Sequence, residues 1–289
     1  VTGTPTAQAV NTSFNATVKA VDAAFNTVTS ESGAASIATD DVNDTDPAGA
    51  NFSSGQITFS VTNLTAGGSR NITPTSGALS ANNSSNYVVN AGAATQIIVV
   101  MPGQSHVQGQ ASLAAAVTGT PTTQTVGGSF NVTVKAVDAA FNTVTTSTNL
   151  IALTTTDAND TEPGDNNLSA GVQTFSITNV TAGTGLSMSP STGGLTTNAS
   201  SSYDVNPGSP TQTIVVLPGQ THVPGNSSLA TAVTGTPTAQ AVNTSFVATV
   251  EAVDAFFNTN TANVSAITIA TSDATYKDFN VGKYKKIIF

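Results

Sequence analysis

The chain of 289 residues lacks cysteine and tryptophan entirely. Without cysteine it has no disulfide framework, no thiolate nucleophile and no cysteine-ligated zinc site. Charged residues are also scarce: they make up 8% of the chain, against roughly 25% in an average soluble domain. This scarcity does not predict disorder, because 38% of the residues are hydrophobic and the polar remainder is mostly uncharged threonine, serine and asparagine. Such a composition suits an extracellular setting.

Positive charge is especially rare. The chain has 7 lysines and arginines against 16 acidic residues, which gives a formal net charge of −9 and an isoelectric point near 4.2. This balance argues against nucleic acid or an anionic membrane as a partner. The longest apolar runs, such as residues 97–101, are far too short to cross a bilayer, so we expect no membrane span. No cationic segment followed by an apolar one opens the sequence, and we expect any export signal to have been removed or to lie outside it.

A long internal repeat dominates the sequence. The hexapeptide VTGTPT begins at residues 1, 117 and 233, so the period is 116 residues. Between residues 1–29 and 117–145, 24 of 29 positions are identical without a gap. A period of this length corresponds to a whole domain, since the units of solenoid proteins are roughly 20 to 50 residues long.

Within each period the apolar residues alternate with polar ones. Phe14, Ala16, Val18 and Ala20 form such a series, and the same pattern returns one and two periods later. This periodicity of two is typical of a half-buried β-strand. No stretch of ten or more residues shows a convincing helical period. Short strands separated by clusters of Gly, Pro, Asn and Asp predict an all-β chain of antiparallel β-sandwiches.

Two short turn-forming segments, residues 90–93 and 206–210, are the predicted linkers between domains. On this phase residues 94–209 form one complete domain. Residues 1–93 form an incomplete domain that lacks its first strand, and residues 210–289 form an incomplete domain with a divergent C-terminal tail. Four of the seven basic residues lie in the last 13 positions, where the match to the repeat has ended.

The segments FNVTVKAVDAAFNT (residues 130–143) and VVLPGQT (residues 215–221) resemble tandem bacterial immunoglobulin-like repeats, which occur in large secreted adhesins and cell-surface proteins. The resemblance covers nearly the whole chain up to about residue 273. It implies tandem antiparallel immunoglobulin-like β-sandwiches joined by short linkers, at the cell surface or outside the cell. Those families often have glycine before the turn asparagine, whereas this chain has Phe25, Phe141 and Phe257 there. We hypothesise that these rings pack on a neighbouring domain.

Two acidic loops, one in each of the first two periods, are candidate calcium sites, because calcium prefers clustered carboxylate and amide oxygens. They are not EF-hands, since the glycine and the distal glutamate of that motif are absent. The alternative, which we favour, is a solvated turn in which Asp and Asn accept hydrogen bonds from nearby backbone amides. The candidate ligands are Asp41, Asn43, Asp44 and Asp46 in the first loop and Asp157, Asn159, Asp160 and Glu162 in the second.

Other potentially reactive side chains do not form a catalytic set. Asp22, Asp138 and Asp254 follow the main strand of each period, and we expect them to cap turns because no partner acid or base lies within reach. His106 and His222 are repeat equivalents in a polar connector, and we expect a surface position for both. The sequence has no nucleotide-binding or nucleophile-elbow motif in a suitable context, so we predict that the protein is not an enzyme and has no cofactor apart from the candidate calcium.

These observations predict a non-enzymatic extracellular structural protein, a subunit of a surface fibre or filament built from the repeats. The expected partner is another copy of the chain or tandem domains of the same chain. A sandwich that lacks a strand exposes an edge that a neighbour can fill by strand donation, and residues 284–289 are the candidate donor. One alternative is a segment of a giant cell-surface adhesin with a host-surface or glycan ligand, and another is a carbohydrate-binding module.

Overall fold

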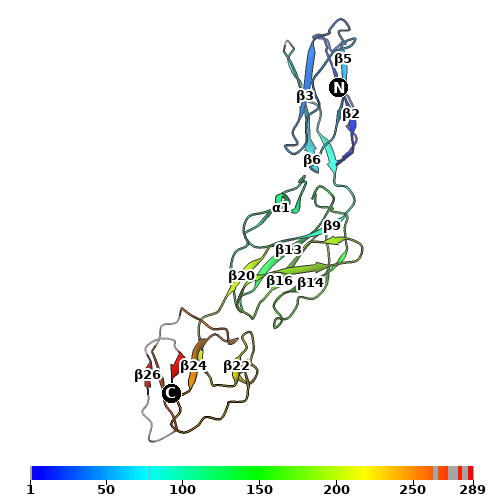
Figure 1. Cartoon of the computed structure of the whole chain (residues 1–289). Coiled ribbons are helices and arrows are strands. Elements are labelled where there is room, and N and C mark those ends of the chain that lie inside the picture. Colours follow the sequence, from blue (N-terminus) through cyan, green and yellow to red (C-terminus); the bar gives the residue numbers. More distant parts are fainter. Residues whose placement is uncertain (1, 78, 263–265, 273–278, 282–285, 289) are drawn as a thin grey trace.

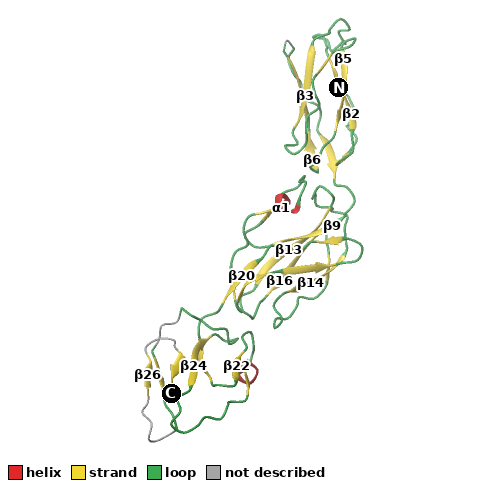
Figure 2. Ribbon diagram, viewed as in Figure 1, coloured by secondary structure: helices red, strands yellow, loops and turns green. Residues whose placement is uncertain are grey.

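A computed structural model of the chain describes residues 2–77, 79–262, 266–272, 279–281 and 286–288. Three β-rich bodies follow one another in a row (Figure 1), and strands dominate each of them (Figure 2). We call residues 1–93, 94–209 and 210–289 the first, second and third modules. No described sheet contains strands from two modules, while the module boundaries themselves stay a prediction. Neither described helix, at four residues each, has the length to cross a bilayer.

The second module is a two-layer sandwich, which confirms the predicted all-β fold. One layer has the strand order β16-β13-β9-β19, and the other consists of the sheets β15-β14-β18 and β12-β20-β17. The strands are β9 (Gln96–Val100), β12 (Gln124–Thr125), β13 (Phe130–Val137), β14 (Leu150–Thr155), β15 (Asn166–Asn167), β16 (Val172–Ile177), β17 (Gly183–Leu186), β18 (Met188–Ser191), β19 (Thr196–Thr197) and β20 (Tyr203–Asn206).

The alternating residues of the central strand β13 build the core of this sandwich. β13 pairs antiparallel with both β9 and β16, which places Val132 and Val134 between the layers. There they pack with Ile151 and Leu153 of β14, and all four side chains are at most 1% exposed. Full burial of such a side chain contributes about 1.5–3 kcal/mol. The core therefore accounts for the stability of a domain that has no disulfide.

A connector, residues 102–118, covers the outer face of β9 and β13. It contains β10 (Ser105–His106), which pairs with β11 (Val117–Thr118), and the single-turn helix α1 (Leu113–Ala116). Ser112 precedes the helix, and its hydroxyl accepts a hydrogen bond from the Ala115 N–H at 3.3 Å. Ala116 and Phe141 pack with Ile98 and Val100 in a second, smaller core beneath this connector.

The first module repeats this architecture without a described counterpart of β9, of β19 or of the connector. Its strand β2 therefore has one described partner, β5, whereas β13 has two. Ala16 and Val18 on β2 are only half-buried, while the equivalent Val132 and Val134 are fully buried. The strands are β1 (Gln8–Ala9), β2 (Phe14–Lys19), β3 (Ala34–Thr39), β4 (Ala50–Asn51), β5 (Gln56–Val61), β6 (Gly67–Arg70), β7 (Ile72–Ser76) and β8 (Tyr87–Asn90).

In the third module the C-terminal tail closes the sheet. Strand β24 lies between β21 and β27, as β13 lies between β9 and β16. The tail residues expected to act as a donor to another copy thus pair within their own chain at β27, and the remaining residues of 284–289 lie outside the described part. The elements are β21 (Gln212–Val216), β22 (Gln220–His222), α2 (Leu229–Ala232), β23 (Val233–Gly235), β24 (Val247–Val253), β25 (Ile267–Ile269), β26 (Phe279–Val281) and β27 (Lys286–Ile288).

Candidate functional site at the junctions between modules

Each module has an Asp-Ala-Ala/Phe-Phe-Asn turn after its main strand. In the second module, Asp138 Oδ1 accepts hydrogen bonds from the backbone N–H groups of Ala140 and Asn142, both at 2.9 Å. The side chain of Asn142 donates from Nδ2 to both carboxylate oxygens at 3.1 Å. Phe141 takes the left-handed backbone conformation, with φ of 58°. The aspartate thus caps the turn, as predicted from the sequence.

The turn of the second module reaches across to the first module. Asp138 Oδ2 accepts a hydrogen bond from the Gly92 N–H at 2.8 Å. Asn142 Oδ1 accepts from the Ala66 N–H at 2.9 Å, and Asn142 Nδ2 donates to the Leu64 carbonyl at 2.9 Å. Asp138 is 2% exposed and Asn142 is fully buried. Buried polar groups hold a geometry firmly, because breaking such a bond leaves an unpaired group away from water.

The same three bonds recur between the second and third modules. Asp254 Oδ2 accepts from the Gly208 N–H at 2.8 Å, and Asn258 Oδ1 accepts from the Ala182 N–H at 2.8 Å. Asn258 Nδ2 donates to the Val180 carbonyl at 2.9 Å. Every partner is displaced by 116 residues from its equivalent at the first junction. Both junctions therefore join successive modules through the same contacts.

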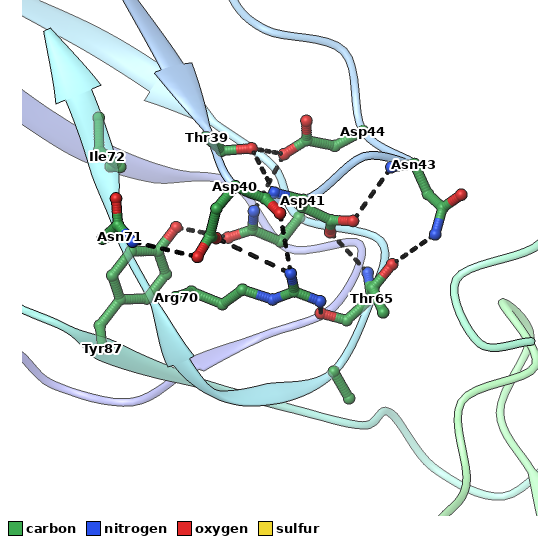
Figure 3. Close-up of polar contacts among 12 residues, drawn as sticks. Thr39, Asp40, Asp41, Asn43, Asp44, Thr65, Arg70, Asn71, Ile72 and Tyr87 are labelled. Atoms are coloured by element: carbon green, nitrogen blue, oxygen red, sulfur yellow. Dashed lines mark hydrogen bonds and ion pairs between the residues drawn. The ribbon is translucent and has the colours of Figure 1, made fainter.

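The acidic loop of the first module holds the backbone to which this turn bonds; Figure 3 shows the polar contacts of the loop, with Asp41 beside Asn43 and Thr65. Asp41 is 3% exposed, and its Oδ2 accepts from the N–H groups of Leu64 and Thr65 at 2.9 and 2.7 Å. Burial disfavours the ionised form of Asp41, but the hydrogen bonds from Thr65, Asn43 and Leu64 outweigh it and hold its pKa below the usual value. The carboxylate fixes the 64–66 backbone whose carbonyl and N–H groups bond to Asn142.

A neighbouring carboxylate, Asp44, supports the loop from inside. Its Oδ2 accepts from Thr39 Oγ1 at 2.7 Å and from Asn63 Nδ2 at 3.0 Å, and Asn63 Oδ1 in turn accepts from the Tyr87 hydroxyl at 3.0 Å. Burial, followed by the charges of Asp41 and Asp46, raises the pKa of Asp44. Burial likewise raises the pKa of Tyr87 to about 12. The second module repeats the chain of bonds with Asp160, Asn179 and Tyr203.

The candidate calcium ligands thus lie in equivalent loops, but their oxygen atoms serve the protein's own hydrogen bonds. Besides Asp41 and Asp44, Asp46 Oδ1 accepts from the Thr39 N–H at 2.8 Å, and Glu162 accepts from the Thr155 N–H at 2.9 Å. Among the described residues, no three carboxylate or imidazole side chains are grouped so that they could hold a metal ion. Calcium binding stays a prediction. The loops are more buried than the solvated turns that we favoured.

Asn43 links the acidic loop of the first module to the connector of the second. It donates from Nδ2 to the Gln108 carbonyl at 3.2 Å and accepts at Oδ1 from Gln110 Nε2 at 3.0 Å. Gly109, between these two, has a φ of 74°, and a Cβ there would collide with Thr65 Oγ1. At the second junction a Cβ on Gly225 would meet Thr181 Oγ1 in the same way. Glycine is therefore required for the close approach.

The two histidines attach each connector to the turn. His106 and His222 are half-buried, and their Nε2 atoms lie 2.8 and 2.7 Å from the carbonyl oxygens of Phe141 and Phe257. The neighbours of their Nδ1 atoms differ in charge. Lys135 Nζ, a cation, lies 3.3 Å from Nδ1 of His106, whereas Glu251 Oε2, an anion, lies 2.8 Å from Nδ1 of His222. Burial, together with the Lys135 charge, lowers the pKa of His106. Both lie in the connector, as predicted, although neither is fully exposed.

The hypothesis that the turn phenylalanines pack on a neighbouring domain is wrong for the two that are buried. Phe141 and Phe257 are 5% and 4% exposed, and they pack against residues of their own modules beneath α1 and α2. Phe25 is 76% exposed, since the first module has no such connector. The junction roles of Gly109 and Asn43 were not predicted from the sequence. The sequence feature that could have indicated these roles is the recurrence of both residues one repeat later, as Gly225 and Asn159.

Two packed layers, one of which has a central strand paired on both sides, are typical of immunoglobulin-like β-sandwiches, so the predicted fold is confirmed. No protein-family model matches the sequence, and no curated protein is significantly similar to it. Among solved structures, the chain is similar to the D0-D1 domain of intimin (15% identity over 70% of this chain and 94% of that one, TM-score 0.27). It is also similar to the Escherichia coli adhesin FdeC (20% identity, 90% and 74%, TM-score 0.35). A third similar structure is β-glucuronidase 3 of Bacteroides uniformis (11% identity, TM-score 0.28), of which the chain spans 21%.

Proposed function

We propose that the chain is a non-enzymatic structural protein of the cell exterior, in which immunoglobulin-like modules are joined end to end at fixed angles to give reach. The observation that carries this proposal is the recurrence, 116 residues apart, of three buried hydrogen bonds across each junction. A flexible linker would need none of them. The uncharged surface of threonine, serine and asparagine supports an extracellular location.

Distance measurements between spin labels test the fixed angle. Because the chain has no cysteine, Asn15→Cys and Asn131→Cys, at exposed equivalent positions of the first two modules, place a label in each. We expect a distance distribution as narrow as that of a control pair within the second module, Asn131→Cys with Asn166→Cys. A distribution much broader than the control would mean that the modules move independently, and the proposed function would be wrong.

The proposal has a finer form, in which modules are completed by strand donation. One edge of β2 pairs with no described strand, which supports this form, because the equivalent edge of β13 pairs with β9 in antiparallel register, with Val134 opposite Val99. An unpaired strand edge is a template for another strand. The donor we propose is a segment with the sequence of β9, since the tail at β27 is engaged within its own module.

A peptide with the sequence of residues 94–104 tests strand donation. We expect it to bind the full chain saturably and to slow hydrogen exchange of the β2 amides that face the free edge. The control peptide carries Val99→Pro, which removes a backbone donor and fixes φ. Equal protection by both peptides, or by neither, contradicts the proposal.

The alternatives make different demands. If the chain is a segment of a giant adhesin, the native protein should have a mass far above 28.8 kDa. If the chain is a fibre subunit, the native mass should be near 28.8 kDa, not counting any attached glycans. A carbohydrate-binding module needs exposed aromatic platforms. Of the three turn phenylalanines, Phe141 and Phe257 are buried, which leaves Phe25 as a single exposed ring. Observed burial thus favours the structural function.

A further inference from the structure

The first module carries the same turn as the other two, with no described module in front of it. Asp22 Oδ1 accepts from the N–H groups of Ala24 and Asn26 at 2.9 and 2.8 Å, and Asn26 Nδ2 donates to Asp22 Oδ2 at 3.1 Å. Phe25 has a φ of 63°, close to the 58° of Phe141 and the 61° of Phe257. The turn therefore takes its docked shape without a neighbour, so docking would cost little ordering entropy.

Three atoms of this turn are available to a partner. At the junctions, the aspartate Oδ2 and the asparagine Oδ1 and Nδ2 bond to the preceding module. Asp22 and Asn26 are exposed, and the structure gives their side chains no hydrogen bond to a described residue outside the turn. We propose that the Asp22–Asn26 turn is a docking surface for the far end of another module of this repeat.

The observed junctions define what this partner must present. It needs two backbone N–H donors and one carbonyl acceptor, as supplied by Gly92, Ala66 and Leu64 in the first module. In both modules the carbonyl and one N–H lie on an Asn-Leu/Val-Thr-Ala loop, residues 63–66 and 179–182, held by a buried aspartate, while the other N–H belongs to the linker glycine, Gly92 or Gly208. A further module of the same repeat presents this set.

A second copy of the turn itself does not fit. Hydrogen bonds from the backbone and side chain of Asn26 lower the pKa of Asp22, so its carboxylate is an acceptor at neutral pH. Two such turns face to face would place two carboxylates against each other, and the repulsion between these like charges disfavours the contact. The charge of the turn therefore favours a loop of backbone N–H groups over self-association.

The inference rests on the proposed function, since it extends the rigid array by one junction. It is separable from strand donation. A donated strand and its connector would cover β2 and Phe25, whereas the turn bonds fix the angle between modules. Hydrogen exchange of β2 reports the first event, and the distance between labels in two modules reports the second.

The test uses an extended chain with residues 94–232 joined ahead of Val1 of the full protein. VTGTPT follows residue 232 in the natural sequence and also begins at Val1, so the fusion keeps the repeat in phase. Spin labels replace Asn131 of the added module and Asn15 of the first. We expect the narrow distance distribution found between Asn15 and Asn131 of the unextended chain. Asn26→Ala should abolish it, as Asn142→Ala should at the next junction.

Each other outcome overturns the docking proposal in a distinct way. A broad distribution with protected β2 amides means that the strand is supplied but the turn does not dock. A broad distribution with unprotected β2 contradicts strand donation as well. A narrow distribution that survives Asn26→Ala assigns the angle to other contacts. If the unextended chain dimerises in sedimentation and Asn26→Ala prevents it, the occupant is a second copy of the turn and our choice is wrong.

Discussion

The first and second modules contain the same turn in opposite surroundings. Asp22 and Asn26 are exposed and Asp138 and Asn142 are buried, yet the hydrogen bonds within the two turns match. Phe25 is 76% exposed and Phe141 5%. The conformation is thus encoded locally, by an aspartate that caps amides two and four residues ahead. Burial comes from the neighbouring module and the connector, so each first-module residue is a control for its second-module counterpart.

The phenylalanine pair should show the largest difference. Phe141→Ala leaves a cavity under the α1 connector, and loss of a buried phenylalanine typically costs about 3–5 kcal/mol. Phe25→Ala removes an exposed ring and should change the free energy of unfolding by less than about 0.5 kcal/mol. Chemical denaturation, monitored by hydrogen exchange of the β9 and β2 amides, measures the free energy of unfolding of both variants. Similar costs for the two variants would contradict the distinction.

The asparagine pair isolates the junction. Asn142→Ala leaves the Ala66 N–H and the Leu64 carbonyl without their partner, which should cost about 1–3 kcal/mol. Asn26→Ala loses only the bond within its own turn and serves as the matched control. Faster exchange of the Ala66 amide in Asn142→Ala alone is the expected signature. Unchanged exchange would mean that this bond does not hold the modules together.

Two glycines with the same backbone angle sharpen the comparison further. Gly109 and Gly185 have φ of 74° and 73°. A Cβ at Gly109 collides with Thr65, whereas at Gly185 no described residue other than its two chain neighbours has a heavy atom within 4 Å of a Cβ. In both alanine variants the backbone strain at positive φ should lower the free energy of unfolding by about 1 kcal/mol. Gly109→Ala alone should also broaden the label distance between Asn15 and Asn131. Equal broadening in Gly185→Ala would assign the effect to strain instead of the clash.

The sequence predicted features that depend on neighbours along the chain. The alternation around Phe130 identifies β13 because side chains of a strand point to opposite faces, and the spacing of Asp138 and Asn142 identifies the cap. The repeat spacing also predicts that residues 1–93 lack a first strand, and this stays a prediction; in the structure β2 has one described partner, β5.

Contacts between distant segments could not be read in this way. Phe141 packs under a connector that begins some forty residues earlier in the chain, and periodicity does not reveal where such a segment folds back. The clustered acids left a calcium site and a solvated turn as alternatives, with the turn favoured, because composition alone does not distinguish a metal ligand from an acceptor of backbone N–H groups. The role of Asp41 at the junction follows from its hydrogen bonds to the N–H groups of Leu64 and Thr65, which lie more than twenty residues away in the sequence.

The smallest expected effect is a loss of stability of the second module in mild acid. Burial and the Lys135 charge lower the pKa of His106 in the folded state below the 6.5 of an unperturbed histidine. As the pH falls through this value, the unfolded chain binds the proton more readily, so the second module should lose stability. Lys135→Glu places a carboxylate beside His106, as Glu251 lies 2.8 Å from Nδ1 of His222, and removes the lysine charge, so it should reverse the loss. Denaturation at pH 7.5 and 5.5, with histidine ring protons followed by NMR, measures both. If Lys135→Glu leaves the second module equally sensitive to acid, the lysine charge does not cause the loss of stability. His106→Gln then shows whether the histidine ring contributes to that loss.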